Sequence, residues 1–184
     1  TAKFVQYLPD FDWQPMVLTA HPRSYLIKDE NFTKDFDNVI VKRAFALDSA
    51  KHLSLYGRYV KWSALPDRWV TWCAGAIPSG ISLIKRHKPA FLFSTYPIAS
   101  SHLIAYILHK MTGIPWIADF RDPMTDTHYP ADKSTKRIYQ WIEKRAINHS
   151  VHKLFTTTDS CEMLKDRFPG VDSGQFSVIA NGYD

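Results

Sequence analysis

The stretch Ala90–Asp122, AFLFSTYPIASSHLIAYILHKMTGIPWIADFRD, contains the pattern that decides the fold. It begins and ends with short apolar runs, AFLFS and IPWIA, which are typical of buried strands. Between the runs, apolar residues recur with the i, i+3, i+4, i+7 spacing of one helix face: Ile104, Ile107, Leu108 and Met111. Gly113 suits the helix C-cap. Two buried strands joined by a helix are expected to be parallel.

The same unit repeats along the chain. A loop of turn formers at 123–132 leads into a predicted helix, whose apolar stripe is Ile138, Trp141, Ile142 and Ala146. LFTTT predicts a strand, Asp159 with Glu162 predicts a capping box for a helix that ends near Gly170, and FSVIANGYD predicts a last strand. Upstream, AKFVQYL predicts a helix, and PMVLTA and NVIVKRA predict strands. Alternating strands and helices predict an α/β fold with a doubly wound parallel sheet, which is Rossmann-like.

Composition limits the class of protein. The 184 residues, 45% hydrophobic and 14% aromatic, suit a single globular domain, and the net charge of +5 suits anionic partners. Two cysteines without metal-ligand spacing predict neither a zinc site nor a disulfide framework, and they favour a reducing compartment, so we expect a cytoplasmic location. The sequence contains no dinucleotide-binding fingerprint, Walker loop or secretory signal, and nothing in it predicts a nucleic-acid partner.

Polar residues follow several of the predicted strands, at the sheet edge where ligands bind in such folds. Thr95, Ser101 and His102 lie near the start of the helix in the opening stretch. Free backbone N–H groups at a helix start suit phosphate or a sugar hydroxyl, so these three residues are predicted to bind the acceptor or a phosphate. The alternative is that Ser100 or Ser101 only caps the helix and His102 lies beside it.

The charged sequence DFRD, at 119–122, follows the apolar run IPWIA. On an extended segment Asp119 and Arg121 would share one side, and Asp122 would take the other. Two carboxylates around a guanidinium could hold hydroxyls and phosphate in one cleft. We predict that Asp122 orients or deprotonates an acceptor hydroxyl, that Arg121 faces phosphate charge, and that Asp119 holds Arg121 in place. The alternative is a clasp that only ties down the loop.

A segment rich in aromatic and basic residues spans Leu53–Trp72. Its composition suits the interface between water and anionic lipid. The residues predicted to face the membrane are Arg58, Lys61, Trp62, Arg68 and Trp69. The alternative is a pair of core-packing helices with a solvated basic side. The uncharged stretch between Lys88 and Lys110 is interrupted by Ser, Thr, Pro and His, which favours a strand and a helix over a membrane span.

The sequence PWIADFRDPM, preceded by FSTYPIASSHLIA and followed near the end by VIANGYD, resembles the N-terminal domain of group 1 type glycosyltransferases of the GT-B fold. The resemblance extends over nearly the whole chain. It implies that 1–180 form the acceptor-side, Rossmann-like domain, that 181–184 begin the interdomain linker, and that Asn181 and Gly182 form the hinge. The family's opening strand and Gly-rich loop would precede Thr1.

For the intact enzyme, the resemblance implies transfer of a sugar, as by a hexosyltransferase, from a nucleotide-sugar to a hydroxyl. It implies retention of configuration, no metal and no cofactor, because the donor is a co-substrate bound by a second, C-terminal domain. The acceptor would be a sugar or a lipid-linked sugar of bacterial surface polysaccharide or glycolipid synthesis, near the inner face of the cytoplasmic membrane. This chain alone would be inactive. The alternatives are a non-catalytic module that binds carbohydrate or phosphate, and an Asp-dependent α/β phosphotransferase.

Overall fold

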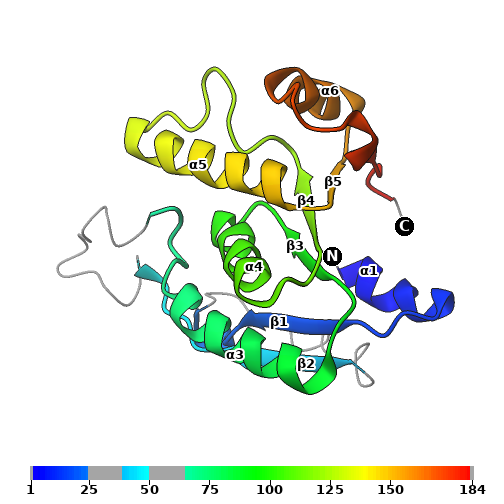
Figure 1. The fold of residues 1–184 in the computed structure, drawn as a ribbon. Helices are drawn as coiled ribbons and strands as arrows, with labels where there is room; N and C mark the ends of the chain where they lie inside the picture. The colour runs from blue at the N-terminus through cyan, green and yellow to red at the C-terminus, as the bar shows by residue number, and fades with distance from the viewer. Residues whose placement is uncertain (1, 25–38, 50–64, 183–184) are drawn as a thin grey trace. The chain divides into compact units, whose positions relative to one another are not determined.

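The structure is a computed structural model that describes residues 2–24, 39–49 and 65–182. The chain divides into two compact units. Unit 1 contains Thr1–Ala64 and Arg68–Leu83, and unit 2 contains Leu65–Asp67 and Ile84–Asp184. Both units consist of strands and helices that alternate along the chain (Figure 1).

Unit 1 contains a parallel pair of strands, β1 (Met16–Ala20) and β2 (Ile40–Ala44). Its other described elements are α1 (Ala2–Tyr7), η1 (Leu8–Phe11), η2 (Pro22–Ser24) and most of α3 (Trp72–His87). In α3, Gly75 lies against the backbone of Phe45, and a Cβ at Gly75 would lie 2.4 Å from the Phe45 carbonyl oxygen. Only glycine permits this close approach.

Unit 2 is a four-stranded parallel sheet in the order β3-β4-β5-β6. Its elements follow in the sequence β3 (Leu92–Thr95), α4 (Ala99–Thr112), β4 (Trp116–Arg121), α5 (Lys133–His149), β5 (His152–Phe155), α6 (Thr158–Arg167), η5 (Ser173–Gln175) and β6 (Phe176–Val178). The predicted α/β class with parallel strands is confirmed. Because these strands are parallel, all their carboxyl ends lie at one edge of the sheet.

The helix ends agree with the sequence except at α6. Gly113, with φ of 73°, is the C-cap of α4 as predicted. Asp132 caps α5 through its side chain. Helix α6 begins earlier than predicted, since its N-cap is Thr157, whose hydroxyl accepts from the Ser160 N–H over 3.2 Å. The predicted capping role of Asp159 is therefore wrong, because Asp159 already lies inside the first turn.

The core of unit 2 is largely aromatic. The rings of Phe120 and Phe155 stack at 5.4 Å, and those of Phe155 and Phe176 stack at 6.1 Å, so one aromatic row crosses β4, β5 and β6. The predicted position of Trp141 in the apolar stripe of α5 is wrong, since its side chain is 45% exposed. The buried face of α5 is instead made of Tyr139, Ile142, Glu143, Ala146 and Ile147.

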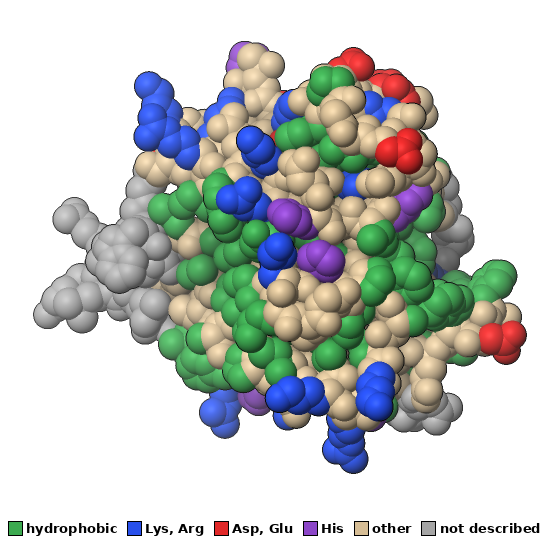
Figure 2. All heavy atoms as spheres, viewed as in Figure 1, with side chains coloured by type: hydrophobic (Ala, Val, Ile, Leu, Met, Phe, Trp, Pro, Cys, Tyr) green, Lys and Arg blue, Asp and Glu red, His purple; other side chains and the backbone are tan. Residues whose placement is uncertain are grey.

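Two further features concern the surface. Lys, Arg and His side chains gather over α4 and α5 (Figure 2). Asp and Glu side chains gather over the neighbouring helix α6 in the same view. Within the described ranges, no helix has both the length and the apolar character needed to cross a bilayer.

Candidate functional site

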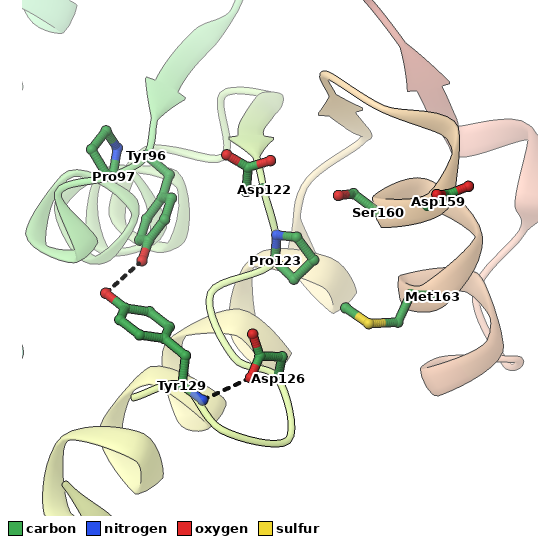
Figure 3. A pocket seen from close by; sticks show the side chains of 9 residues that line it. All are labelled: Tyr96, Pro97, Asp122, Pro123, Asp126, Tyr129, Asp159, Ser160 and Met163. Carbon is green, nitrogen blue, oxygen red and sulfur yellow. Dashed lines mark hydrogen bonds between the residues drawn. The ribbon is translucent and has the colours of Figure 1, made fainter. Parts of the chain in front are cut away.

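An open pocket of about 510 Å³ lies at the carboxyl ends of β3, β4 and β5. Its walls come from the residues that follow β3 and β4, from the loop before α5 and from the start of α6 (Figure 3). The lining residues are Tyr96, Pro97, Asp122, Pro123, Asp126, Tyr129, Asp159, Ser160 and Met163. The pocket thus lies at the edge of the sheet where ligands bind in parallel α/β folds.

The charge in the pocket is negative. Asp122, Asp126 and Asp159 line it, and no Lys or Arg is among the lining residues. Asp126 accepts hydrogen bonds from the backbone N–H groups of His128 and Tyr129, over 2.6 and 2.7 Å, and these bonds lower the pKa of its carboxyl. Carboxylates accept hydrogen bonds from hydroxyls and repel phosphate, so the pocket suits a neutral polyhydroxyl ligand better than a nucleotide.

Two tyrosines close one side of the pocket. The hydroxyl groups of Tyr96 and Tyr129 lie 3.5 Å apart, and the Tyr129 ring is 49% exposed. An exposed ring of this kind offers an apolar face to one side of a sugar. The pocket therefore combines hydrogen-bond acceptors with aromatic surface.

Asp122 is an exposed carboxylate in this pocket. Its backbone N–H donates to the Phe120 carbonyl over 2.6 Å, which forms a tight turn directly after β4. Its Oδ1 lies 3.5 Å from the Thr156 hydroxyl, which also donates to the Arg121 carbonyl over 2.8 Å. The Asp122 carboxylate thus retains lone pairs for a ligand hydroxyl.

The geometry of Asp119 and Arg121 differs from the predicted extended segment. Strand β4 continues to Arg121, and its pairing with β5 is irregular between Asp119 and Arg121. Arg121 has φ of 59°, in the left-handed region that non-glycine residues rarely adopt. This bulge breaks the side-chain alternation, so the prediction that Asp119 and Arg121 share one side no longer follows from strand geometry.

Asp119 is buried and accepts a hydrogen bond from the Thr95 hydroxyl over 2.8 Å. Burial raises the pKa of Asp119, while Thr95 and the charge of Arg121 lower it. Among the described residues no ion pair joins Asp119 to Arg121, whose Nη2 instead donates to Asn181 Oδ1 over 3.4 Å. Arg121, which was predicted to be catalytic, therefore contacts Asn181 of the predicted hinge. Gly182, the other residue of the predicted hinge, is exposed.

His102 has no exposed surface, and its ring stacks at 6.4 Å on that of Tyr96, which lines the pocket. Trp116 Nε1 donates to Ser94 Oγ over 2.8 Å, and the same hydroxyl forms a hydrogen bond with His102 Nδ1 over 2.7 Å. The other ring nitrogen, His102 Nε2, is buried without a hydrogen-bond partner among the described residues. Burial lowers the pKa of His102 to about 3. The burial argues against the predicted direct contact between His102 and an acceptor.

The carboxylate of Asp67 accepts hydrogen bonds at the N-terminus of α4. Asp67 accepts from the Ser100 backbone N–H over 2.7 Å and from the Ser100 hydroxyl over 3.0 Å. Ser101 donates its hydroxyl to the Ile98 carbonyl over 2.8 Å, so neither serine caps the helix by accepting a hydrogen bond. A phosphate at this helix start would meet the Asp67 charge, which argues against the predicted phosphate site at Ser101.

The residues predicted to face a membrane are only partly described. Arg58, Lys61 and Trp62 lie outside the described residues. Arg68 donates to both carboxylate oxygens of the buried Asp48, with Nε to Oδ1 at 2.9 Å, and lies over the Trp69 ring at 5.1 Å. The charge of Arg68 therefore has a carboxylate partner within unit 1, and membrane contact by this segment stays a prediction.

Several pocket residues were not predicted from the sequence. Asp126 and Tyr129 belong to the loop at 123–132, in which only turn formers were recognised, and Asp159 was interpreted as a cap. Tyr96 and Asp159 follow the ends of β3 and β5, at the edge where the sequence places ligands, whereas Asp126 and Tyr129 lie farther beyond the end of β4, where strand position alone gives no signal. Within the part of the chain that the structure describes, no group of three or more His, Cys, Asp or Glu side chains is arranged to hold a metal ion.

Comparison with known proteins supports the fold. No family model and no curated protein sequence matches the chain. Among solved structures, it is similar to Anabaena Alr3699/HepE in complex with UDP and glucose, with a TM-score of 0.54 and 12% identity over 100% of this chain and 40% of that one. It is also similar to UDP-N-acetylglucosamine 2-epimerase from Rickettsia bellii, with a TM-score of 0.52 and 14% identity over 98% of this chain and 41% of that one.

The chain thus spans about two fifths of the length of each of these structures. At such low identity the similarity concerns the fold alone. The fold is α/β with parallel strands, consistent with a Rossmann-like half of a GT-B fold.

Proposed function

We propose that this chain is the acceptor-side domain of a nucleotide-sugar-dependent glycosyltransferase with a second, donor-binding domain. The resemblance of PWIADFRDPM and its flanking segments to group 1 type glycosyltransferases supports this proposal. So does the fold shared with HepE, which was solved with UDP and glucose. In this role the acceptor sugar binds in the acidic pocket, and the nucleotide binds to the other domain.

The observation that carries the proposal is the absence of basic side chains from the pocket lining, together with three carboxylates and two tyrosines. A donor diphosphate needs cations or free N–H groups around it. Here the described α4 N-terminus is occupied by Asp67, and the pocket is acidic. A neutral sugar hydroxyl, in contrast, can donate to Asp122 or Asp159 while a ring face packs on Tyr129.

In the proposed reaction, Asp122 accepts a hydrogen bond or the proton from the acceptor hydroxyl as that oxygen bonds to the anomeric carbon of the donor. The bond from that carbon to the donor phosphate breaks, and the diphosphate leaves with its charge. Arg121 lies next in sequence and carries the only guanidinium in the DFRD segment, so we assign it to this developing charge. By its resemblance, the enzyme acts in bacterial surface polysaccharide or glycolipid synthesis.

Binding to the 184-residue chain tests the proposal. The ¹⁵N-labelled chain is titrated with neutral methyl glycosides and, separately, with UDP and GDP. We expect glycosides to shift the backbone amide signals of Asp122, Tyr129 and Asp159 with dissociation constants on the order of millimolar. The nucleotides should leave these signals unchanged.

The matched control is a pair of Asp→Asn variants on α6. Asp159→Asn changes the pocket and should weaken glycoside binding, whereas Asp166→Asn changes an exposed residue that does not line it. Nucleotide binding at these amides, or no response to any glycoside, would contradict the assignment of the pocket to the acceptor.

A further inference from the structure

Helix α5 carries an asymmetric set of charges. Between Lys133 and His149, Lys and Arg occupy five positions: Lys133, Lys136, Arg137, Lys144 and Arg145. The one acidic residue of the helix, Glu143, has a side chain that is 1% exposed and is paired with Arg167. The accessible surface of α5 is therefore cationic.

Most of these charges have no carboxylate partner. In the described part of the chain, no ion pair involves Lys133, Arg137 or Lys144, and all three are exposed. Lys136 differs from these three, since it donates to the Thr127 carbonyl over 3.0 Å and its charge helps to lower the pKa of Asp126. A helix face with unpaired cations attracts an anionic partner.

The end of α4 extends this surface, since α4 and α5 pack together. The Tyr106 ring meets the Trp141 ring edge-on at 6.2 Å and lies 5.2 Å from the His149 ring. Burial and the positive charges of Lys110, His109 and Arg145 lower the pKa of His149. The like charges at this junction thus repel one another, and an anion would relieve the repulsion.

Apolar side chains stand among these cations. Trp141 is 45% exposed with the Arg145 guanidinium over its ring at 5.1 Å, and Met111 is 60% exposed. We call Lys110, Met111, Arg137, Trp141, Lys144 and Arg145 the α4–α5 surface. Lys, Arg and His side chains gather where this surface lies in Figure 2.

We propose that the α4–α5 surface binds the anionic surface of a lipid membrane. Lys and Arg contact lipid phosphates while Trp141 and Met111 enter the headgroup region, which is the division of roles that amphipathic interfacial surfaces show. Exposed Trp and Met favour a lipid partner over duplex DNA, whose phosphate backbone is contacted mainly by cations. The inference concerns a different segment from Leu53–Trp72, and it does not depend on the proposed sugar transfer.

Vesicle sedimentation of the 184-residue chain at 0.15 M salt tests the proposal. We expect binding to vesicles of phosphatidylcholine with phosphatidylglycerol and much weaker binding to phosphatidylcholine alone. Each basic residue near such a surface contributes about a fivefold factor in affinity, so Arg137→Gln with Lys144→Gln should weaken binding about 20-fold. The control, Lys85→Gln with Arg86→Gln, removes the same charges from exposed positions of α3 and should change binding by less than about twofold.

Two further variants keep the proposal testable if the first one folds poorly. Lys110→Glu reverses a charge on α4, and Trp141→Ser removes the exposed ring, and each should weaken binding to anionic vesicles. Equal losses in the α5 and α3 double variants would overturn the proposal. So would equal binding to both vesicle types, binding to DNA but not to vesicles, or loss of binding only when Arg58 and Lys61 are replaced.

Discussion

Arg167 Nη1 donates to Glu143 Oε2 over 2.6 Å, although Glu143 lies in α5 and Arg167 lies at the end of α6. Both side chains also bind Thr125. Glu143 accepts from the Thr125 backbone N–H and hydroxyl, over 3.2 and 3.1 Å, and Arg167 Nη2 donates to the Thr125 carbonyl over 2.9 Å. The loop that carries Asp122 and Asp126 into the pocket is therefore anchored to two helices.

Replacing Glu143 tests this anchor. Glu143→Gln keeps the shape of the side chain but leaves Arg167 without its carboxylate, and we expect the free energy of unfolding to fall by about 1–3 kcal/mol. Arg167 is partly exposed, so water limits the loss. Urea unfolding followed by circular dichroism measures it.

The matched control for Glu143→Gln is Glu162→Gln. Glu162 forms an ion pair with Lys165 at 2.8 Å within α6, but its side chain is 57% exposed. Exposed pairs of this kind contribute little, so the control should lose less than about 0.5 kcal/mol. Equal losses in the two variants would show that the buried pair does not anchor the loop.

Glu143 also shows what the sequence could and could not predict. Periodicity predicted a helix at α5, but it placed Trp141 on the buried face, because pattern analysis favours apolar residues over Glu for that position. In the structure, Glu143 lies on the buried face of α5 and Trp141 does not. Burial of the Glu143 carboxylate is possible because Thr125 and Arg167 donate hydrogen bonds to it. Those partners are 18 and 24 residues away, so no local rule could have found them.

The candidate site was predictable in its location but not in its details. Strand ends of a parallel sheet identify the edge, and Asp122 lies there as predicted from its position after β4. The bulge at Arg121, the burial of His102 and the capping of α4 by Asp67 depend on tertiary contacts. Local patterns therefore predicted the elements and their edge, whereas the contacts of each side chain required the structure.

His102 should make stability depend on pH. Because its pKa in the folded chain is about 3, below the ordinary 6.5, the unfolded chain takes up a proton at this site over that range and the folded chain does not. The free energy of unfolding should therefore fall as the pH is lowered from 6.5 towards 3. His102→Asn should reduce this dependence.

The measurement is urea unfolding at pH 7 and pH 5, with His87→Asn as the control. His87 is exposed at the end of α3, so its replacement should leave the difference between the two pH values unchanged. The loss of ring contacts at 102, where Phe120 lies 4.9 Å away, lowers stability at both pH values and cancels in that difference. An unchanged difference in His102→Asn would contradict the burial of a neutral ring.

If the proposed glycosyltransferase function holds, Arg121→Lys should lower sugar transfer by the two-domain enzyme about tenfold or more, because an ammonium group cannot reproduce the planar guanidinium at a phosphate. The same change would also remove the contact between Nη2 and Asn181 Oδ1. Arg86→Lys, an exposed change on α3 outside the α4–α5 surface, is the control and should leave turnover unaltered. If Arg121→Lys has normal turnover, Arg121 has no part in the reaction.

Asp122→Asn in the proposed two-domain glycosyltransferase tests the central assignment. Asn has the size of Asp but cannot accept a proton, so turnover should fall by roughly 10² or more if Asp122 acts as a general base. Stability should change little, because Asp122 is exposed and its side-chain contact with the Thr156 hydroxyl is long at 3.5 Å. Asp166→Asn, which removes a carboxylate from an exposed position outside the pocket, should preserve turnover. The decisive comparison is between turnover and melting temperature: near-normal turnover with a melting temperature lower by several degrees would mean that DFRD serves only to hold the loop.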